Sequence, residues 1–294
     1  MPFMNASKPI LTAFAIISIL IYPKTILCAQ DFDIPRSSPK ASISQHIGVT
    51  QIKIEYCRPS TKGRKIFGEL IPFGKVWRAG ANEATTISFP HEIQIEGESV
   101  PAGKYALFTI PDTENWTIIL NSDWNQWGAY QYQADKDVLR VEVSAAQSQF
   151  MEQFTISFSE VTKTSGVISL QWENTRINFT VETNTYANTL SEIDEVTSEL
   201  GASWYVYSAA AQYHFYELKN TEEAIKLLNV AIALEAPNPA PWMLKSQILA
   251  YEEKYEEAIK QARLALEVCN NHNFPHEIDE NEEQIKKWEI LSGK

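Results

Sequence analysis

The chain has 294 residues, enough for two domains of ordinary size. Its formal net charge of −12 at pH 7 argues against a nucleic-acid partner, because binding to nucleic-acid phosphates requires a basic surface. The acidic excess is uneven: residues 184–294 hold 9 Lys and Arg against 19 Asp and Glu, whereas residues 30–183 hold 14 against 18. The chain therefore divides into two regions of different charge.

The first 29 residues have the pattern of a secretory signal peptide. Lys8 precedes an apolar run over residues 10–22, and Ala29 provides a small residue at the cleavage site. A membrane-spanning helix needs about 20 apolar residues, so the run is too short to be one. We expect an exported protein of the periplasm or cell exterior, associated with the envelope and without a membrane span after cleavage. An uncleaved anchor and lipidation of Cys28 are the alternatives.

Residues 30–183 carry the apolar and polar alternation of half-buried strands. In the first such stretch, from Val49, the side chains of Ile52, Ile54 and Tyr56 fall on one face. The further predicted strands are 85–89, 93–95, 104–110, 116–121, 138–143, 154–161, 167–172 and 175–183, with a turn at 96–98. About nine short strands without a helical period between them predict an all-β antiparallel sandwich or barrel.

The second region has the 3.6-residue period of helices. Glu-Glu-Ala-Ile-Lys occurs at 222–226 and again at 256–260, and Ala231 recurs as Ala265, an offset of 34 residues in both cases. A 34-residue period with small residues at helix contacts resembles the tetratricopeptide repeat. We expect an all-α repeat over residues 203–294, preceded by a connecting helix or linker at 184–202. The expected helices are 203–217, 221–235, 240–252 and 256–269, followed by a capping helix at 278–291.

No motif defines a reaction. The signatures of serine hydrolases, zinc proteases and nucleotide-binding proteins do not occur in the sequence. His46 and His91 have no carboxylate nearby at ligand spacing, and we predict neither a metal nor a cofactor. Cys57 and Cys269 lie far apart, one in each region, and are expected to be thiols rather than a disulfide.

Residues 58–89, RPSTKGRKIFGELIPFGKVWRAGANEATTISF, concentrate the chemistry of a binding site. Arginine offers a planar fork for carboxylate or phosphate, Asn and Thr offer directional hydrogen bonds, and Trp offers an apolar wall. Aromatic and amide side chains at 124–132 suit a sugar ring, although aromatics also fill cores. The candidate ligand-binding residues are Arg64, Trp77, Arg78, Asn82, Glu83, Thr85, Trp127 and Tyr130.

The same stretch allows a catalytic and a structural interpretation. Glu83 is the candidate catalytic group, and with Glu69 it would provide the carboxylate pair of a glycosidase. In the structural alternative, Gly80 and Asn82 adopt left-handed backbone at a tight turn, while Glu83 neutralises an arginine as an ion pair.

Three separated motifs, YCRPSTKGRKIFGELIPFGKVWRAGANEATTISF, AGKYALFTIP and WGAYQY, occur in this order. Together they resemble the DUF2911 family of secreted bacterial proteins, which has no assigned activity. The resemblance covers about residues 40–182 and implies a fold and an exported location. It implies no catalytic cysteine, because the position of Cys57 is more usually Ser in that family.

The sequence therefore predicts an exported binding or scaffolding protein of the cell envelope. We expect a small polar ligand or glycan to bind the β region and a protein or peptide to dock on the helical repeats. The alternative is a hydrolase-type enzyme that acts on a small polar or carbohydrate-like substrate at Arg64, Arg78, Asn82 and Glu83.

Overall fold

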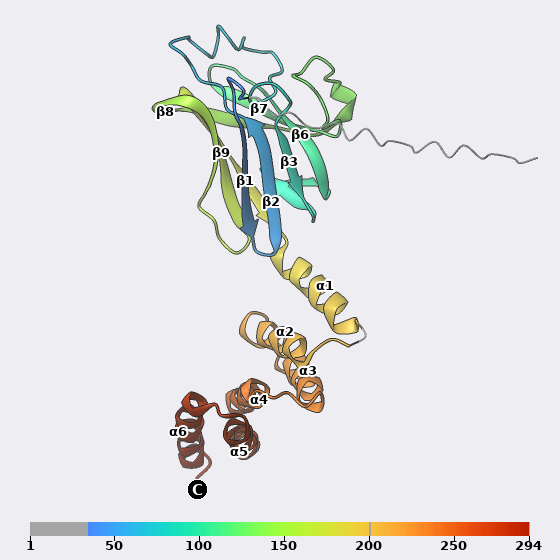
Figure 1. The fold of residues 1–294 in the computed structure, drawn as a ribbon, viewed down its shortest axis with the longest axis vertical. Coiled ribbons are helices and arrows are strands. Elements are labelled where there is room, and N and C mark those ends of the chain that lie inside the picture. The colour runs from blue at the N-terminus through green and yellow to red at the C-terminus, as the bar shows by residue number, and fades with distance from the viewer. Residues whose placement is uncertain (1–34, 200, 294) are drawn as a thin grey trace, which may run out of the picture. The chain divides into compact units, whose positions relative to one another are not determined.

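The computed structural model describes residues 35–199 and 201–293. Within them, nine strands over residues 40–183 are followed by six helices over residues 185–291 (Figure 1). This order confirms the predicted fold class, an all-β antiparallel region followed by an all-α region. The predicted signal peptide and Cys28 lie outside the described residues.

All neighbouring strands of the β region pair in antiparallel fashion, in the order β1-β2-β3-β6-β7-β8-β9-β4-β5. The strands are β1 (Lys40–Ile47), β2 (Thr50–Cys57), β3 (Thr86–Phe89), β4 (Ile93–Ile95), β5 (Glu98–Val100), β6 (Gly103–Ile110), β7 (Asn115–Asn121), β8 (Asp137–Ser159) and β9 (Ser165–Thr183). The turn predicted at 96–98 is confirmed: it connects β4 to β5, and Glu96 and Gly97 have φ angles of 50° and 84°. Such a pair of left-handed residues is typical of a two-residue hairpin turn.

Strands β8 and β9 each join two of the predicted short strands into one. The first half of β8 pairs with β7 and its second half pairs with β9, with shifts of register at Gln147, Met151 and Thr155. The long strand thus carries the sheet from one part of the β region to the other. Strand β1, which the sequence did not predict, pairs with β2 along its whole length at the edge of the sheet.

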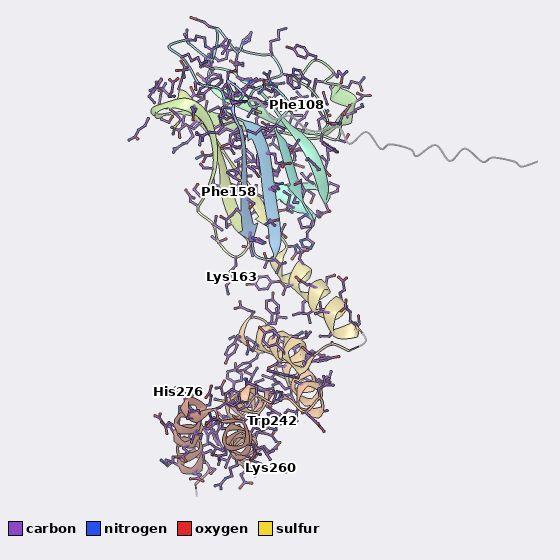
Figure 2. All side chains as sticks on the ribbon, viewed as in Figure 1. Phe108, Phe158, Lys163, Trp242, Lys260 and His276 are labelled. Atoms are coloured by element: carbon purple, nitrogen blue, oxygen red, sulfur yellow. The ribbon has the colours of Figure 1, made fainter. Side chains whose placement is uncertain are left out.

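One buried cluster forms the main core of the β region and extends from Ile47 to Val181. Its centre is aromatic: the ring of Trp77 stacks on Trp172 at 6.0 Å between centroids and lies edge-on to Phe154 at 5.2 Å. Because side chains alternate along a strand, β6 also contributes side chains to the opposite face of the sheet. There Phe108, labelled in Figure 2, packs in a second cluster with Ala84, Ala106 and Ile119.

The helices are α1 (Thr185–Ser198), α2 (Trp204–Tyr216), α3 (Thr221–Ala233), α4 (Ala240–Tyr251), α5 (Tyr255–His272) and α6 (Pro275–Leu291). Residues related by the 34-residue offset occupy equivalent places. Ala224 and Ala258, like Ala231 and Ala265, are fully buried. The small side chains let neighbouring helices approach closely, as the repeat pattern predicts.

Helix α1 begins on the β region. The side chain of Asn184 accepts a hydrogen bond from the backbone N–H of Ala187, which caps the helix. Thr185 is buried, and its hydroxyl donates to the carbonyl of Lys163 at 2.6 Å. Asn188, one turn later, donates to the Thr50 hydroxyl at 3.2 Å. The first turn of α1 therefore packs with the strands that precede it.

Candidate functional site

The loop from Trp77 to Thr85 connects the aromatic core to β3. The backbones of Trp77 and Thr109 exchange two hydrogen bonds of 2.7 and 2.8 Å, and the indole N–H of Trp77 donates to the carbonyl of Gly80. The hydroxyl of Thr85 donates to the carbonyl of Ala79 at 2.6 Å. Trp77 and Thr85 are buried at 4% and 0% exposure, so these two candidate residues anchor the loop inside the protein.

The turn itself has the left-handed backbone that the structural interpretation predicts. Gly80 and Asn82 have φ angles of 155° and 59°. A Cβ atom at Gly80 would lie 3.0 Å from the carbonyl oxygen of Cys57, so the neighbouring strand approaches too closely for a side chain. The side-chain amide of Asn82 donates to the carbonyl of Ser38 at 3.3 Å, and the backbone carbonyl of Asn82 accepts from the backbone N–H of Gly128 at 2.9 Å. Asn82 therefore joins the loop to two other segments.

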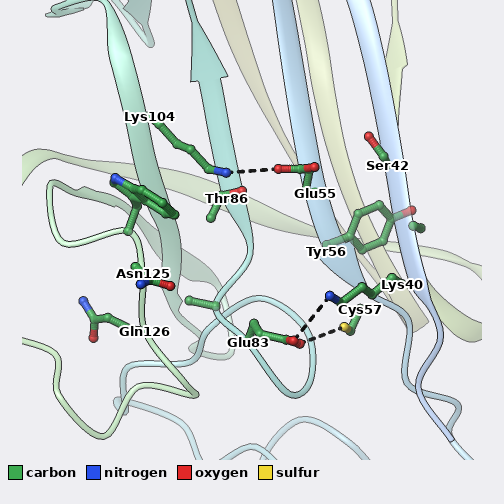
Figure 3. A pocket seen from close by; sticks show the side chains of 13 residues that line it. Lys40, Ser42, Glu55, Tyr56, Cys57, Glu83, Thr86, Lys104, Asn125 and Gln126 are labelled. Atoms are coloured by element: carbon green, nitrogen blue, oxygen red, sulfur yellow. Dashed lines mark hydrogen bonds and ion pairs between the residues drawn. The ribbon is translucent and has the colours of Figure 1, made fainter. Parts of the chain in front are cut away.

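Two pockets flank this loop. The first, which we call the lysine pocket, has a volume of about 570 Å³ and is shown in Figure 3. It is lined by Lys40, Ala41, Ser42, Glu55, Tyr56, Cys57, Glu83, Ala84, Thr86, Lys104, Trp124, Asn125 and Gln126. These residues come from β1, β2, β3 and β6 and from the loops before β3 and after β7. Of the candidate residues, this pocket contains Glu83.

Two clusters of charged groups lie along the lysine pocket. Lys104 pairs with Glu55 at 3.1 Å, as Figure 3 shows, and the second contact of Glu55 is with Lys53 at 2.9 Å. The hydrogen bonds from Lys53 and then Lys104 lower the pKa of Glu55. In the other cluster, the ammonium of Lys40 lies 3.5 Å from the carboxylate of Glu83. This carboxylate also accepts a hydrogen bond from the thiol of Cys57 at 3.6 Å. The pocket thus presents both signs of charge.

Aromatic and amide groups complete the lysine pocket. The ammonium of Lys104 lies over the ring of Trp124, 4.5 Å from its centroid, and Trp124 is 41% exposed. Gln126 is 4% exposed, and the Oε1 atom of its side chain has no hydrogen-bond partner among the described residues. An acceptor buried in this way usually has a partner, and a bound donor group would provide one.

The second pocket, which we call the arginine pocket, has a volume of about 360 Å³. It is lined by Ser37, Ser38, Pro59, Ser60, Lys62, Arg64, Leu70, Ile71, Arg78, Gly80, Ala81 and Trp172. The guanidinium of Arg64 is held by the carbonyls of Thr61 and Ser60, at 2.9 and 2.7 Å. Arg78 is half-buried, and this burial lowers the pKa of its guanidinium.

The candidate residues therefore do not form one site: they are divided between the core, the two pockets and the exposed surface. Arg64 and Arg78 share the arginine pocket, whereas Glu83 lines the lysine pocket. Trp127 and Tyr130 line neither pocket; they are 58% and 85% exposed, and a single backbone bridge pairs Trp127 with Glu83.

Glu69, the proposed partner of Glu83, lines neither of these pockets and pairs with Lys65 at 3.6 Å. The carboxylate that shares a pocket with Glu83 is instead Glu55.

Sequence reasoning missed several residues that line the lysine pocket. Lys40 lies on the edge strand β1, which the sequence does not predict, and Lys104 lies in the predicted strand at 104–110 without any sign of a site. Trp124, Asn125 and Gln126 belong to the aromatic and amide segment at 124–132, from which only Trp127 and Tyr130 are predicted as candidate residues. The sequence feature that could have predicted Trp124, Asn125 and Gln126 is the combination of amides and an aromatic side chain directly after a buried strand.

The described residues contain no group of three or more His, Cys, Asp or Glu side chains placed to hold a metal ion. His46 is exposed, and the ring of His91 lies 3.0 Å from the hydroxyl of Thr50. Cys57 and Cys269 are both buried thiols outside any disulfide, as expected. None of the described helices combines the length and apolar character needed to span a bilayer.

Comparison with known proteins agrees with the motifs. No curated protein matches the chain. Residues 38–181 match the model of a family described as a protein of unknown function, DUF2911, and they include nearly all of the strands and every lining residue of both pockets except Ser37. The β region therefore matches the DUF2911 family, as its three motifs predict.

Proposed function

We propose that the β region binds a small polar ligand, such as a glycan fragment, in the lysine pocket. The volume of about 570 Å³ falls in the range of small-molecule sites. The observation that carries the proposal is the lining: two lysines, two glutamates, Asn125 and Gln126 line the same space as the half-exposed indole of Trp124.

The arrangement favours a ligand with several hydroxyl or amide groups over an apolar one. An apolar ligand would bury the charges of Glu55 and Lys104 without replacing their water, which costs free energy. A polyhydroxylated ligand can instead donate to the carboxylates while its ring lies beside the indole of Trp124, one face of which Lys104 covers. Both contacts use groups that are already in place.

The test is a glycan and small-molecule screen by thermal shift, followed by calorimetry with each hit. Lys104→Gln and Trp124→Ala should each weaken binding about tenfold or more, since each removes one charged or stacking contact. Lys75→Gln is the matched control, because Lys75 is exposed and does not line the pocket. A hit that binds all three variants equally does not occupy the lysine pocket and contradicts the proposal.

A hydrolase-type enzyme is the second candidate, favoured by the presence of two carboxylates, Glu55 and Glu83, in one pocket. The hydrogen bonds that lower the pKa of Glu55 suit a base or nucleophile, which leaves Glu83 as the candidate acid. In an enzyme, Glu83→Gln should reduce turnover of a glycoside at least a hundredfold while the substrate still binds. In a binding protein, no turnover is found in either form and the variant changes affinity alone.

We further propose that the protein is exported and that the signal peptide is removed after Ala29. Lys8, the apolar run and Ala29 support the proposal. Protein recovered from the cell envelope should begin at Gln30 when its N-terminus is sequenced. A soluble cytoplasmic form that begins at Met1 would contradict export, and a lipid on Cys28 would change the mode of attachment.

For the helical region we propose a docking role toward a basic protein or peptide. Tyr205 and Tyr216 lie on one face of α2, and Tyr251 of α4 contacts Phe215, the neighbour of Tyr216. The three tyrosines are 66%, 51% and 63% exposed, and the region carries 19 acidic against 9 basic side chains. Binding to arrays of basic and acidic peptides tests the role: basic peptides should bind, and Tyr216→Ser should weaken them. Equal retention of acidic peptides contradicts it.

A further inference from the structure

The arginine pocket collects positive charge and has no carboxylate among the residues that line it. Three cationic side chains line it, Lys62, Arg64 and Arg78, and none of the residues that line it is acidic. The lysine pocket, on the other side of the same loop, is lined by two lysines and two glutamates. The two pockets therefore select for different ligands.

The guanidinium of Arg78 is the group that most needs a partner. It is half-buried, and its Nε atom is buried without a hydrogen-bond partner among the described residues. The burial lowers the pKa of Arg78, which reports the loss of water around the charge. Arg58 shows the usual arrangement: its Nε donates to the carbonyl of Phe154 at 3.1 Å and its Nη2 to the hydroxyl of Thr155 at 2.8 Å. Buried charges are normally paired in this way.

The other two cations are held where they can share a ligand with Arg78. Arg64 uses Nε and Nη2 to bind the carbonyls of Thr61 and Ser60, which fixes the plane of its guanidinium. The nearby carboxylate, Glu152, does not line the pocket. It accepts from the hydroxyl of Thr61 and from the backbone N–H of Lys62, and these bonds lower its pKa. Glu152 therefore holds the loop that presents Lys62 and Arg64, and the charges of these two residues also lower its pKa.

We propose that the arginine pocket is an oxyanion-binding site that takes a phosphate or sulfate group between Arg78 and Arg64, with Lys62 at its edge. A guanidinium presents paired N–H donors to an oxyanion, and charge-assisted bonds of this kind are about twice as strong as neutral ones. The volume of about 360 Å³ leaves room for a small group attached to the anion. Gly80 and Ala81 of the same loop line the pocket beside Arg78.

The proposal goes beyond ligand binding in the lysine pocket and can fail independently of it. The probes are inorganic phosphate and sulfate, added to the whole protein from residue 30, with sodium chloride at equal ionic strength as reference. Binding to the folded state should raise the melting temperature in proportion to the logarithm of the anion concentration above its Kd. Calorimetry should give one site per chain. Acetate tests whether the pocket prefers a carboxylate. If acetate raises the melting temperature and phosphate and sulfate do not, the ligand is a carboxylate and the proposal is overturned.

Variants locate the site. Arg78→Gln should weaken phosphate binding by on the order of tenfold to a hundredfold, the loss expected when charge-assisted hydrogen bonds are removed. Arg64→Gln, at an exposed residue, provides a second test that does not depend on the fold tolerating a change at Arg78. The matched control is Arg176→Gln, which removes the same charge from an exposed residue outside both pockets.

The outcomes separate the two pockets. The oxyanion site is supported if Arg64→Gln and Arg78→Gln lose phosphate binding while Arg176→Gln and Lys104→Gln retain it. It is overturned if phosphate raises the melting temperature no more than sodium chloride does, or if all four variants bind equally. Loss in Lys104→Gln alone would assign the anion to the lysine pocket instead.

Discussion

The β region and the helical region are stabilised in different ways. In the β region one buried cluster joins residues far apart in the sequence, such as Trp77 and Trp172, whose rings stack. In the helical region two smaller clusters join residues of neighbouring helices, and their buried residues include Ala224 and Ala258. The β region should therefore unfold as one unit, whereas each helix pair depends mainly on its nearest neighbours. The lysine pocket and the arginine pocket form where loops from distant segments converge on the core of the β region.

The largest test of this comparison is Trp77→Ala. Removal of a buried indole that contacts Trp172 and Phe154 should lower the free energy of unfolding of the β region by about 3–5 kcal/mol. Urea denaturation followed by tryptophan fluorescence measures the loss. Trp124→Ala is the control, because a side chain that is 41% exposed should cost far less. A similar loss in both variants would mean that the aromatic centre is not what holds the β region together.

A change at the repeat should act on the helices alone. Ala258→Leu inserts three carbons at a fully buried helix contact and should destabilise the helical region by about 1–3 kcal/mol. Thermal melting followed by far-UV circular dichroism should show an earlier helical transition with an unchanged β transition. Ala233→Leu, at an exposed position of α3, should leave both transitions in place. If the β transition moves with Ala258→Leu, the two regions unfold together and the comparison fails.

Truncation tests whether the β region is autonomous and where it ends. A chain of residues 30–183 should fold alone, with a strand spectrum in circular dichroism. A chain of residues 30–198 should be more stable by about 0.5–1.5 kcal/mol, because it keeps the hydrogen bond from Thr185 to Lys163. Thr185→Val in the longer chain should remove this advantage. Aggregation of both truncated chains would show that the β region needs the remaining helices.

The smallest expected effect comes from Glu55 in the lysine pocket. Its bonds to Lys53 and Lys104 lower its pKa, so they stabilise the fold above the ordinary pKa of a glutamate, and this contribution is lost as the pH falls through the lowered value. Because the carboxylate is 44% exposed, solvent screens the pairs and we expect about 0.2–1 kcal/mol at pH 7. Glu55→Gln should melt below the wild type at pH 7 and match it at pH 3. A difference that grows toward acid pH would have the wrong sign.

Local patterns in the sequence determined the elements. The alternation of Ile52, Ile54 and Tyr56 predicts β2, and all three side chains are buried as that pattern requires. The repeated Glu-Glu-Ala-Ile-Lys predicts α3 and α5, which begin at Thr221 and Tyr255. These predictions succeed because a strand or helix with one buried face shows its period within a few residues. The sequence does not predict β1 in the same way, because this edge strand has few buried apolar side chains: Ala41 and Ile43 are only half-buried.

Only the tertiary structure decided how the candidate residues are grouped. The three residues Trp77, Arg78 and Glu83 lie close in sequence, but in the structure they belong to the core, the arginine pocket and the lysine pocket respectively. Conversely, Arg64 joins Arg78, and Lys40 and Lys104 join Glu83, across long separations in the chain. A pocket is formed by segments that pairing of strands brings together, and the strand order depends on the whole sheet rather than on any local pattern. The residue types of a site can therefore be read from this sequence, whereas their partners follow from the fold.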